Sequence, residues 1–258
     1  MHEKIAVYAG TRNLYPDMST AVKSLLANSS VDKVYLLIED DKFPYWLPPM
    51  VETINVSGQT VFPKDGPNYY SGFTYMVLLR ACYTKLLPKT VSKVLQLDID
   101  TVVTDNIDSL WEIDMKGKWF CATKENQKWY KPYGNDYYNI GVCMFNLEQM
   151  RKDHADDLLI NLLNTRKFTY LEQDALNYTG GIDKVVPMDN RFNSSHVTGH
   201  ADNPAIVHFA AIKSWRNATW AKGYKYLEEY RKLSWDDVLE RHEKLKWRGE
   251  NTNAATEN

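Results

Sequence analysis

Short apolar runs alternate with amphipathic stretches through the first ninety residues of the chain. The segments Ile5–Ala9 and Val34–Ile38 are largely apolar, which predicts two buried strands. Between them, residues 16–27 place Met18 and Val22 on one side at helical spacing. A strand followed by a helix and another strand predicts a parallel sheet with right-handed crossovers.

The same alternation continues to the middle of the chain. Residues 53–56 form a short predicted strand, and residues 72–87 return to helical periodicity before Pro88. The run Val91–Leu97 is then a further buried strand. The first half of the chain is therefore predicted to be Rossmann-like.

Beyond residue 111 the pattern is less regular. A terminal helix is predicted from Ser234, which forms a capping box with Asp237, to about Trp247. The polar segment 249–258 is predicted to be a disordered tail. The other predicted elements of this half are strands at 119–122, 140–145, 185–187 and 205–209 and helices at 147–163 and 172–178.

Composition narrows the class of protein. The chain has 258 residues, of which 44% are hydrophobic and 25% charged, as expected for one large globular domain. Its net charge of −2 provides no overall basic field, so we expect no nucleic-acid partner. The three cysteines, Cys82, Cys121 and Cys143, are far apart and are predicted to be reduced and buried.

The N-terminal segment bears on localisation. The chain enters its first strand almost at once, and that apolar run is too short for a signal peptide or a membrane span. We therefore expect a cytoplasmic protein with no integral membrane segment.

The strongest candidate for chemistry is an acidic pair where a strand ends. Asp98 and Asp100 directly follow Val91–Leu97, and residues two apart on an extended segment point the same way. Ligands bind at the ends of strands in open α/β sheets. Two carboxylates suit Mg²⁺ or Mn²⁺ and leave positions open for phosphate. Alternatively, the two aspartates bind no metal and only cap a turn.

This region resembles the Asp-x-Asp segment of glycosyltransferase family 8, both in residues 94–103 and in residues 106–111 that follow. Four further segments match motifs of that family in the same order, so that the resemblance spans about residues 5–215. They are an Arg-containing helix (residues 77–88), an Asn-x-Gly strand (residues 138–142), a Glu-Gln-Asp segment (residues 172–177) and a His-to-Trp segment (residues 208–215).

The resemblance implies a single GT-A domain over residues 1–248, an α/β fold with a mixed, mostly parallel central sheet flanked by helices. Residues 1–111 would bind the donor nucleotide, and residues 112–248 the sugar and the acceptor. The implied activity is metal-dependent transfer of glucose or galactose from a UDP-sugar to a hydroxyl of a sugar, glycan or protein, with retention of anomeric configuration. The implied cofactor is Mn²⁺ or Mg²⁺.

The resemblance also implies roles for individual residues. Asp98, Asp100 and His208 would hold the metal, and Lys213 would meet the donor phosphates. Glu172, Gln173 and Lys213 are the candidate catalytic residues. The remaining donor-binding candidates are Ala9, Thr11 and Asn13 near the nucleotide, Ile99 between the two aspartates, and Arg80, Asn139 and Gly141 near the sugar.

Each of these residues also has a plainer interpretation. His208 could be satisfied at a strand edge, Lys213 could be an ordinary surface lysine, and Arg80 could form a structural salt bridge. Glu172 could interact only with a helix dipole. Because Gln173 is an amide and a poor nucleophile, the mechanism that the resemblance favours is front-face substitution, assisted by the leaving phosphate.

The chain departs from the family pattern at several positions. Thr11 stands where some members have Asp, Ile140 replaces a small residue, Ala211 replaces Gly and Ser214 replaces Pro. These changes bear on the donor and on the path of the phosphate loop more than on the fold.

Two other classes compete for the acidic pair. A haloacid-dehalogenase-type phosphatase would use Asp98 as nucleophile and Asp100 as acid/base, although the chain lacks a convincing second acidic cluster after a later strand. A protein that binds nucleotide sugars without turnover is the other alternative.

Overall fold

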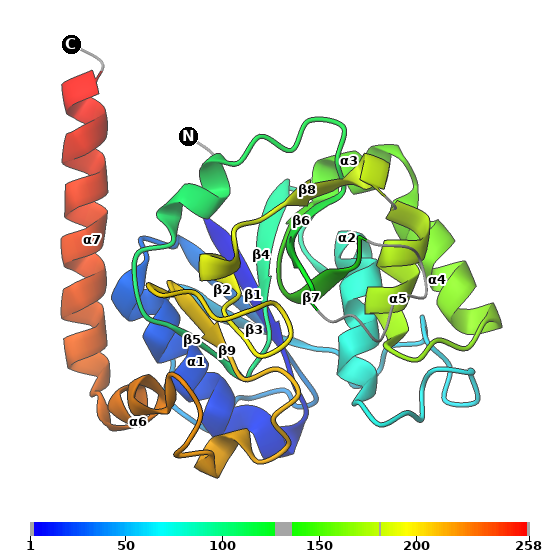
Figure 1. The fold of residues 1–258 in the computed structure, drawn as a ribbon, viewed down its shortest axis with the longest axis horizontal. Helices are drawn as coiled ribbons and strands as arrows, with labels where there is room; N and C mark the ends of the chain where they lie inside the picture. The colour runs from blue at the N-terminus through cyan, green and yellow to red at the C-terminus, as the bar shows by residue number, and fades with distance from the viewer. Residues whose placement is uncertain (1–2, 127–135, 181, 257–258) are drawn as a thin grey trace.

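The computed structural model describes residues 3–126, 136–180 and 182–256. Its centre is a seven-stranded sheet in the order β3-β2-β1-β4-β7-β6-β8, and β5 and β9 form a separate two-stranded sheet (Figure 1). The strands are β1 (Ile5–Ala9), β2 (Lys33–Ile38), β3 (Val51–Asn55), β4 (Lys93–Leu97), β5 (Thr101–Val103), β6 (Phe120–Lys124), β7 (Tyr138–Asn146), β8 (Val185–Pro187) and β9 (Ile206–His208).

The direction of the strands confirms a mixed, mostly parallel sheet. Strands β1, β2, β3 and β4 pair in parallel, as does β6 with β8. Strand β7 is antiparallel to both of its neighbours, β4 and β6. Consequently β4 and β6 run the same way, and their carboxyl ends lie at one edge of the sheet.

Helices cover both faces of this sheet. They are α1 (Tyr15–Asn28), α2 (Tyr83–Leu86), α3 (Leu147–Lys152), α4 (Ala155–Thr165), α5 (Leu171–Gly180), α6 (Tyr224–Lys232) and α7 (Trp235–Thr256). Short 3-10 segments are η1 (Arg12–Leu14), η2 (Tyr75–Cys82), η3 (Asp108–Glu112), η4 (Ile182–Lys184), η5 (Asn190–Phe192) and η6 (Trp215–Asn217).

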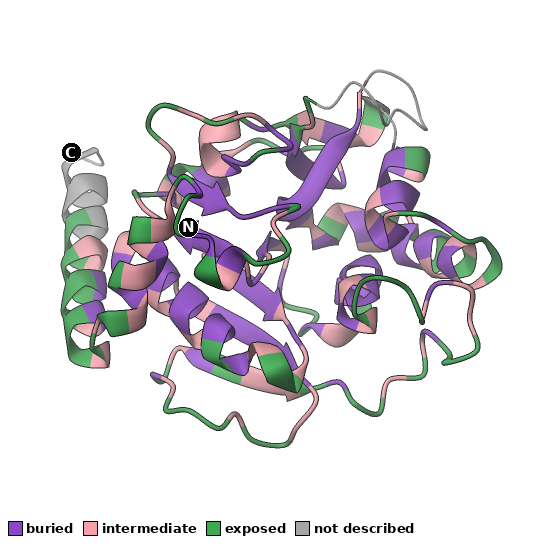
Figure 2. Ribbon diagram, turned by 60° about the horizontal axis from the view of Figure 1, so that its bottom comes forward, coloured by how far each residue is buried: buried purple, intermediate pink, exposed green. Residues whose placement is uncertain are grey.

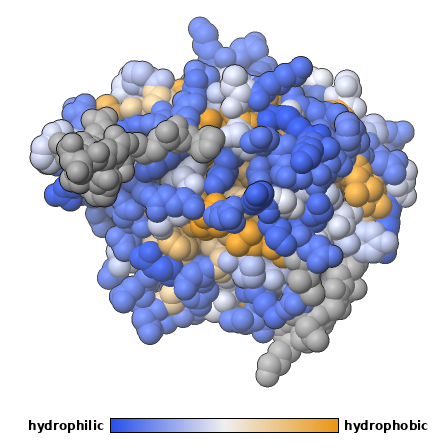
Figure 3. Space-filling model, turned by 90° about the horizontal axis from the view of Figure 1, so that it is seen from above, coloured by the Kyte–Doolittle hydropathy of each residue, from blue (hydrophilic) through white to orange (hydrophobic). Residues whose placement is uncertain are grey.

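The alternation of side chains along β1 shows how the layers are built. Ile5 and Val7 enter the core that η2, α3, α4 and α5 cover, whereas Ala6 and Tyr8 enter the core on the side of α1. Figure 2 shows the resulting pattern, with buried strands between helices whose outer faces are exposed. The face seen in Figure 3 is largely hydrophilic, with small groups of apolar residues.

Two predicted helices differ from the structure. The segment predicted as a helix over 72–87 is the 3-10 segment η2 followed by one short α-helical turn, α2. The helix predicted over 147–163 is broken between α3 and α4, where His154 has a φ of 54°. Asp153 holds the chain at this break, because its carboxylate accepts hydrogen bonds from Trp119 Nε1 and Lys184 Nζ, each at 2.7 Å.

The C-terminal helix is longer than predicted. Helix α7 begins after Ser234, as the capping box indicates, and continues to Thr256. The structure therefore corrects the prediction of a disordered tail for residues 249–256, and residues 257–258 lie outside the described residues. Extending an existing helix costs much less free energy than nucleating one, so a polar segment without proline can continue it.

The remaining global predictions concern the cysteines and the membrane. Cys82, Cys121 and Cys143 are buried and free, as expected. Within residues 3–126, 136–180 and 182–256, no helix is both long and apolar enough to cross a bilayer.

Candidate active site

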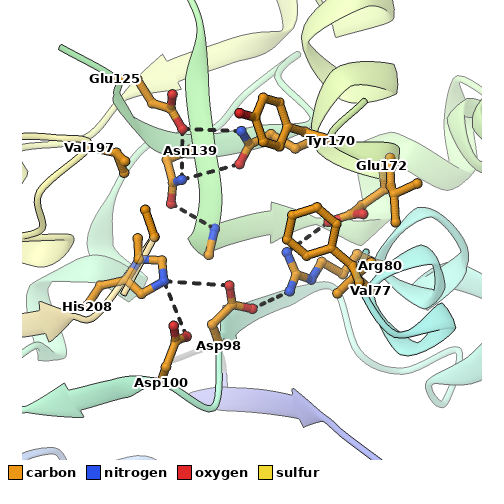
Figure 4. Close-up of a pocket in the computed structure, with 16 residues that line it drawn as sticks. Val77, Arg80, Asp98, Asp100, Glu125, Asn139, Tyr170, Glu172, Val197 and His208 are labelled. Carbon is orange, nitrogen blue, oxygen red and sulfur yellow. Dashed lines mark hydrogen bonds and ion pairs between the residues drawn. The ribbon is translucent and has the colours of Figure 1, made fainter. Parts of the chain in front are cut away.

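A cavity of about 240 Å³ opens at the carboxyl ends of β4 and β6 (Figure 4). It brings together most of the candidates from the two halves of the chain. Those that line it are Arg80, Asp98, Asp100, Asn139, Gly141, Glu172, Gln173 and His208.

Three of these side chains form a cluster that could hold a metal ion. One ligand atom from each of Asp98, Asp100 and His208 lies within 4.8 Å of the others. His208 Nε2 is 3.4 Å from Asp100 Oδ1 and 3.7 Å from Asp98 Oδ2. In an octahedral site, neighbouring ligand atoms lie about 3 Å apart, so an ion needs only a small contraction of this cluster.

The small sheet fixes two of these ligands relative to each other. Thr101 on β5 is in register with His208 on β9. The backbone N–H of Phe209 also donates to the carbonyl of Asp100 at 2.9 Å. Backbone pairing therefore sets the separation between Asp100 and His208.

Gly141 leaves room for the cluster. A Cβ atom on this residue would lie 2.2 Å from His208 Cε1 and 2.7 Å from Asp98 Oδ2. Glycine is thus required by space at this position of β7, because the side chains of two of the three candidate ligands pack directly against it. The donor set of two carboxylates and one imidazole fits a divalent cation.

A chain of amides determines which nitrogen of His208 faces the cluster. The N–H of Gly141 donates to Asn139 Oδ1 at 3.1 Å, and since a backbone N–H can only donate, this contact sets the orientation of that amide. Asn139 Oδ1 also accepts from Asn193 Nδ2 at 3.0 Å. Asn193 Oδ1 therefore faces His208 Nδ1, 2.8 Å away.

The consequence concerns the tautomer of His208. When the ring is neutral, Nδ1 carries the proton that it donates to Asn193, and Nε2 presents its lone pair toward Asp98 and Asp100. A histidine that binds a metal usually donates its other N–H to such an oxygen. Asn193 is fully buried and was not identified from the sequence, where it lies in an irregular segment with no periodic signal.

Removing the side chain of Asn193 should weaken metal binding. We expect Asn193→Ala to raise the dissociation constant for Mn²⁺ about 10- to 100-fold, as is typical for the partners of metal ligands. Calorimetry measures this change, and ¹⁵N NMR at a pH where His208 is neutral reports its tautomer. Asn190→Ala is the matched control, since the side chain of Asn190 has no hydrogen bond within the described residues. A wild-type His208 protonated on Nε2 would contradict the assignment.

The charges of the cluster are mutually balanced. Burial lowers the pKa of His208, but the neighbouring Asp100 outweighs this and the net shift is upward. For Asp100, burial raises the pKa and His208 brings it below its ordinary value. Burial raises the pKa of Asp98, although Arg80 opposes the shift. A bound ion would replace the proton of His208, so metal affinity should fall as the pH falls.

The opposite wall of the cavity is a buried ion-pair network. Arg80 Nη1 donates to Glu172 Oε1 at 2.8 Å, and its Nη2 pairs with Asp98. Arg80 thus has the acidic partners that its position in an apolar segment requires. Burial raises the pKa of Glu172 to about 7, although the charge of Arg80 opposes it. Within the described residues, Arg80 Nε and Glu172 Oε2 are buried without a hydrogen-bond partner.

Gln173 also lines the cavity, and several hydrogen bonds hold its side chain in place. Its Oε1 accepts from the N–H of Ile140 at 3.0 Å, and its Nε2 donates to Tyr137 Oη at 3.0 Å and to Glu125 Oε1 at 3.2 Å. Asn139 Nδ2 also donates to Glu125 Oε1, at 2.9 Å. These bonds fix the amide of Gln173, in agreement with the view that it is not the nucleophile.

Glu125 is a cavity residue that the sequence analysis missed. It directly follows β6, and burial raises the pKa of its carboxyl, partly offset by the hydrogen bonds from Asn139 and Gln173. The rule that identified Asp98, a carboxylate at the end of a buried strand, would have identified Glu125 as well.

The remaining candidates lie outside this cavity. Thr11 lines an adjacent hollow of about 430 Å³ that shares Phe73 with the cavity, and its hydroxyl donates to Asn13 Oδ1 at 2.6 Å. Ala9 is the last residue of β1. Ile99 packs in the core, with its Cδ1 against Gly10. Lys213 is exposed and does not line the cavity.

Two of the residues that line the cavity have strained backbone conformations. Leu171 has a φ of 49° and Ala211 a φ of 65°, both in the left-handed region. Each costs about 1–2 kcal/mol for a residue with a side chain. Ala211 thus adopts the left-handed backbone conformation that favours glycine, although it lacks the freedom of glycine.

The mixed sheet and the acidic cluster at the end of β4 are features of the GT-A type of fold. The model of glycosyl transferase family 8 matches residues 6–219, and the chain therefore belongs to this family.

Known relatives agree with this assignment. Glycosyltransferase GlyB of Streptococcus pneumoniae is 22% identical over 264 residues, a match that covers 93% of this chain and 64% of the relative. Glycosyltransferase GlyD of the same organism is 25% identical over 276 residues, covering 93% of this chain and 32% of the relative. The chain thus spans less than two thirds of the length of these curated relatives.

Solved structures share the fold. The galactosyltransferase LgtC, in complex with donor and acceptor sugar analogues, has a TM-score of 0.73 at 21% identity and is matched over 88% of this chain and 95% of its own. An active-site glutamine-to-glutamate mutant of LgtC has a TM-score of 0.70 at 20% identity, covering 88% of this chain and 94% of that one. GlyE of Streptococcus pneumoniae has a TM-score of 0.69 at 19% identity, covering 93% of this chain and 63% of that one.

Proposed function

We propose that this protein transfers a hexose, glucose or galactose, from a UDP-sugar to a hydroxyl acceptor with retention of anomeric configuration. The observation that carries the proposal is the composition of one cavity. It places the metal-type cluster of Asp98, Asp100 and His208 opposite the pair of Arg80 and Glu172, which presents unsatisfied polar atoms. A nucleotide-sugar donor needs a metal site for its diphosphate and hydrogen-bonding groups for the hydroxyls of its sugar, and the cavity has both.

Asp98 and Asp100, together with Nε2 of His208, would hold Mn²⁺ or Mg²⁺. When bound, the ion supplies Lewis acidity that stabilises the charge developing on the departing diphosphate. The protein orients these ligands before the ion arrives. Arg80 and Gln96 both contact Oδ1 of Asp98, so Oδ2 is left to face His208.

The buried atoms of the opposite wall support a sugar-binding role. Arg80 Nε can donate to a sugar hydroxyl and Glu172 Oε2 can accept from one. Leaving a buried polar group unpaired costs about 1–3 kcal/mol, and hydroxyl groups of the donor would relieve that cost. Asn139 and Gly141 complete this side of the cavity.

The nucleotide would extend from the cluster toward the end of β1. There the backbone of Ala9, the side chains of Thr11 and Asn13 and the segment around Ile99 would contact uracil and ribose. The hydroxyl of Thr11 donates to Asn13, so its lone pairs remain to accept the uracil N–H. Lys213 would approach the donor phosphates from the adjacent loop.

Retention would proceed by front-face substitution. Glu172 is paired with Arg80 and Gln173 is fixed by four hydrogen-bonded neighbours, so neither is arranged as a free nucleophile. We expect Glu172→Gln and Gln173→Ala to lower turnover without inverting the product anomer, which NMR of the product measures. A glycosyl-enzyme trapped on Glu172 would contradict this mechanism.

The competing interpretations make different predictions. Family membership sets aside the phosphatase, which would form an acyl-phosphate on Asp98 and hydrolyse phosphomonoesters. A binding protein without turnover would take up UDP with Mn²⁺ and release no sugar.

A UDP-release assay over a panel of nucleotide sugars tests the proposal. We expect one UDP-hexose to be turned over with Mn²⁺, and expect chelation with EDTA to abolish the release because no ion then stabilises the leaving group. Adding Mn²⁺ back should restore it. Release that is unaffected by chelation would overturn the metal-dependent mechanism, and no release from any donor would favour the binding protein.

A further inference from the structure

The Glu-Gln-Asp segment at the start of α5 contains a residue, Asp174, that the proposed reaction does not use. Asp174 is 1% exposed and does not line the reaction cavity. Its Oδ2 accepts hydrogen bonds from the backbone N–H groups of Thr169 and Tyr170, at 3.0 and 2.9 Å. Its Oδ1 accepts a hydrogen bond from the hydroxyl of Tyr137 at 2.6 Å. The two oxygens of this buried carboxylate therefore serve different partners.

The backbone contacts of Asp174 hold the turn that leads into α5. The two residues that donate to Oδ2 directly precede Leu171, whose φ of 49° lies in the left-handed region. A strained conformation of this kind persists only where its surroundings hold it. Glu172 and Gln173 follow at once, so this carboxylate stabilises the turn from which both cavity residues project.

The contact with Tyr137 sets the direction of a chain of hydrogen bonds. A carboxylate can only accept, so the hydroxyl of Tyr137 gives its single proton to Asp174. Burial raises the pKa of Tyr137 well above its ordinary value, and the charge of Asp174 adds to this shift, so the hydroxyl keeps its proton. The oxygen of Tyr137 is therefore an acceptor for Gln173, whose Nε2 donates to it at 3.0 Å.

This direction decides which end of the Gln173 amide faces β7. With Nε2 turned to Tyr137, Oε1 accepts from the N–H of Ile140 at 3.0 Å and from Asn139 Nδ2 at 3.3 Å. The reverse orientation would place an NH2 group against the N–H of Ile140. It would also place Oε1 against a hydroxyl oxygen whose proton is already given to Asp174. Only one orientation of the amide thus pairs every donor with an acceptor.

We propose that Tyr137 and Asp174 form a positioning pair that sets the orientation of the Gln173 amide in the reaction cavity. The inference rests on the proposed function, because it assigns to that reaction two residues that act through Gln173. Neither of them lines the cavity. An active-site group that is already held in one orientation lowers the barrier to the reaction, because it need not be ordered during the step.

Asp174→Asn tests the direction of the chain, because it exchanges one oxygen for an NH2 group of the same size. The backbone N–H groups of the turn can only donate, so the remaining oxygen must face them and the new NH2 group donates to Tyr137. The hydroxyl proton of Tyr137 is then redirected to Gln173, whose amide must turn. We expect kcat to fall about 100-fold, the scale of a misplaced active-site group, while the donor KM stays within about twofold of the wild-type value.

Removing the misdirected proton should rescue this variant. When Asp174→Asn is combined with Tyr137→Phe, no hydroxyl opposes the original orientation, and the N–H of Ile140 again selects Oε1 of Gln173. We expect kcat of the double variant to be at least about tenfold higher than that of Asp174→Asn. A carboxylate with a merely structural role would make the two losses add. A double variant no more active than Asp174→Asn would therefore overturn the proposal.

A second pair of variants answers the same question if Asp174→Asn does not fold. Tyr137→Phe keeps the ring and removes one hydrogen bond to Gln173, so kcat should fall about tenfold. In the background of Gln173→Ala the same substitution should have no further effect on kcat, because Tyr137 acts only through that amide. An equal loss in both backgrounds would contradict the positioning role.

NMR reports on the amide without any turnover. NOEs from the side-chain amide protons of Gln173 should place them beside the ring of Tyr137 in the wild type. In Asp174→Asn they should move next to the backbone N–H of Ile140. Unchanged NOEs in that variant would overturn the proposal. Failure to release UDP from any donor would instead contradict the proposed function, while the NOEs would still report the orientation of Gln173.

Asp156→Asn is the matched control. Asp156 is a buried carboxylate on α4 that accepts a hydrogen bond from the hydroxyl of Thr84 and does not line the cavity. The substitution should change neither kcat nor the NOEs of Gln173. A loss of kcat equal to that of Asp174→Asn would show that any buried carboxylate has this effect, and would overturn the assignment.

Discussion

Replacing Asp100 with asparagine is expected to reduce metal-dependent UDP release by more than about 100-fold, since even outer partners of metal ligands contribute about 10- to 100-fold. The substitution keeps the size of the side chain and removes one of the two negative charges of the cluster. The loss should appear both in turnover and in the affinity for Mn²⁺ measured by calorimetry.

The matched control is Asp105→Asn. Asp105 lies five residues after Asp100 in the sequence. Its side chain is 60% exposed and pairs with Arg191 instead of the cluster. An exposed ion pair of this kind contributes at most about 1 kcal/mol, so activity and Mn²⁺ affinity should be preserved. Full Mn²⁺ affinity in Asp100→Asn would exclude the assigned site.

Adding a single methyl group at Gly141 should reduce Mn²⁺ binding about as strongly as Asp100→Asn does. A Cβ atom there would lie 2.2 Å from His208 Cε1 and 2.7 Å from Asp98 Oδ2, so one or both ligands must move. We expect Gly141→Ala to abolish measurable Mn²⁺ binding and to destabilise the fold by about 1–3 kcal/mol, as overpacking does. Calorimetry and chemical denaturation measure the two effects separately.

Gly58→Ala provides the comparison, because nothing lies within 4 Å of a Cβ atom at that position. It should change neither metal affinity nor turnover. Should Gly141→Ala bind Mn²⁺ as tightly as the wild type, the positions that His208 and Asp98 take against Gly141 would not be those that hold the metal.

Site residues could be predicted from the sequence where the pattern of neighbouring residues indicates their role. Asp98 and Asp100 follow an apolar strand, and the strand itself sets their common direction. Glu125 obeys the same rule after β6, so it could have been found. Asn193 could not, because its role depends on Asn139 and His208, which are far from it in sequence or on another strand.

The errors in secondary structure have physical causes as well. Strand β5 has only three residues and exists because it pairs with β9, a long-range contact that no local pattern reveals. The break at His154 has neither glycine nor proline, and side chains from other elements, Trp119 and Lys184, stabilise it. The 3-10 segment η2 has nearly the same apolar spacing as an α-helix, so periodicity does not separate the two.

The pairing of β5 with β9 also has a consequence for folding. Thr101 and His208 are adjacent in space but belong to the middle and the last third of the described chain. Such long-range contacts form late, because they close a large loop. The third ligand therefore joins Asp98 and Asp100 only after the C-terminal segments have docked, and Mn²⁺ bound to the native state would raise its melting temperature. Metal uptake would thus distinguish a completely folded chain from one in which β5 and β9 have not yet paired.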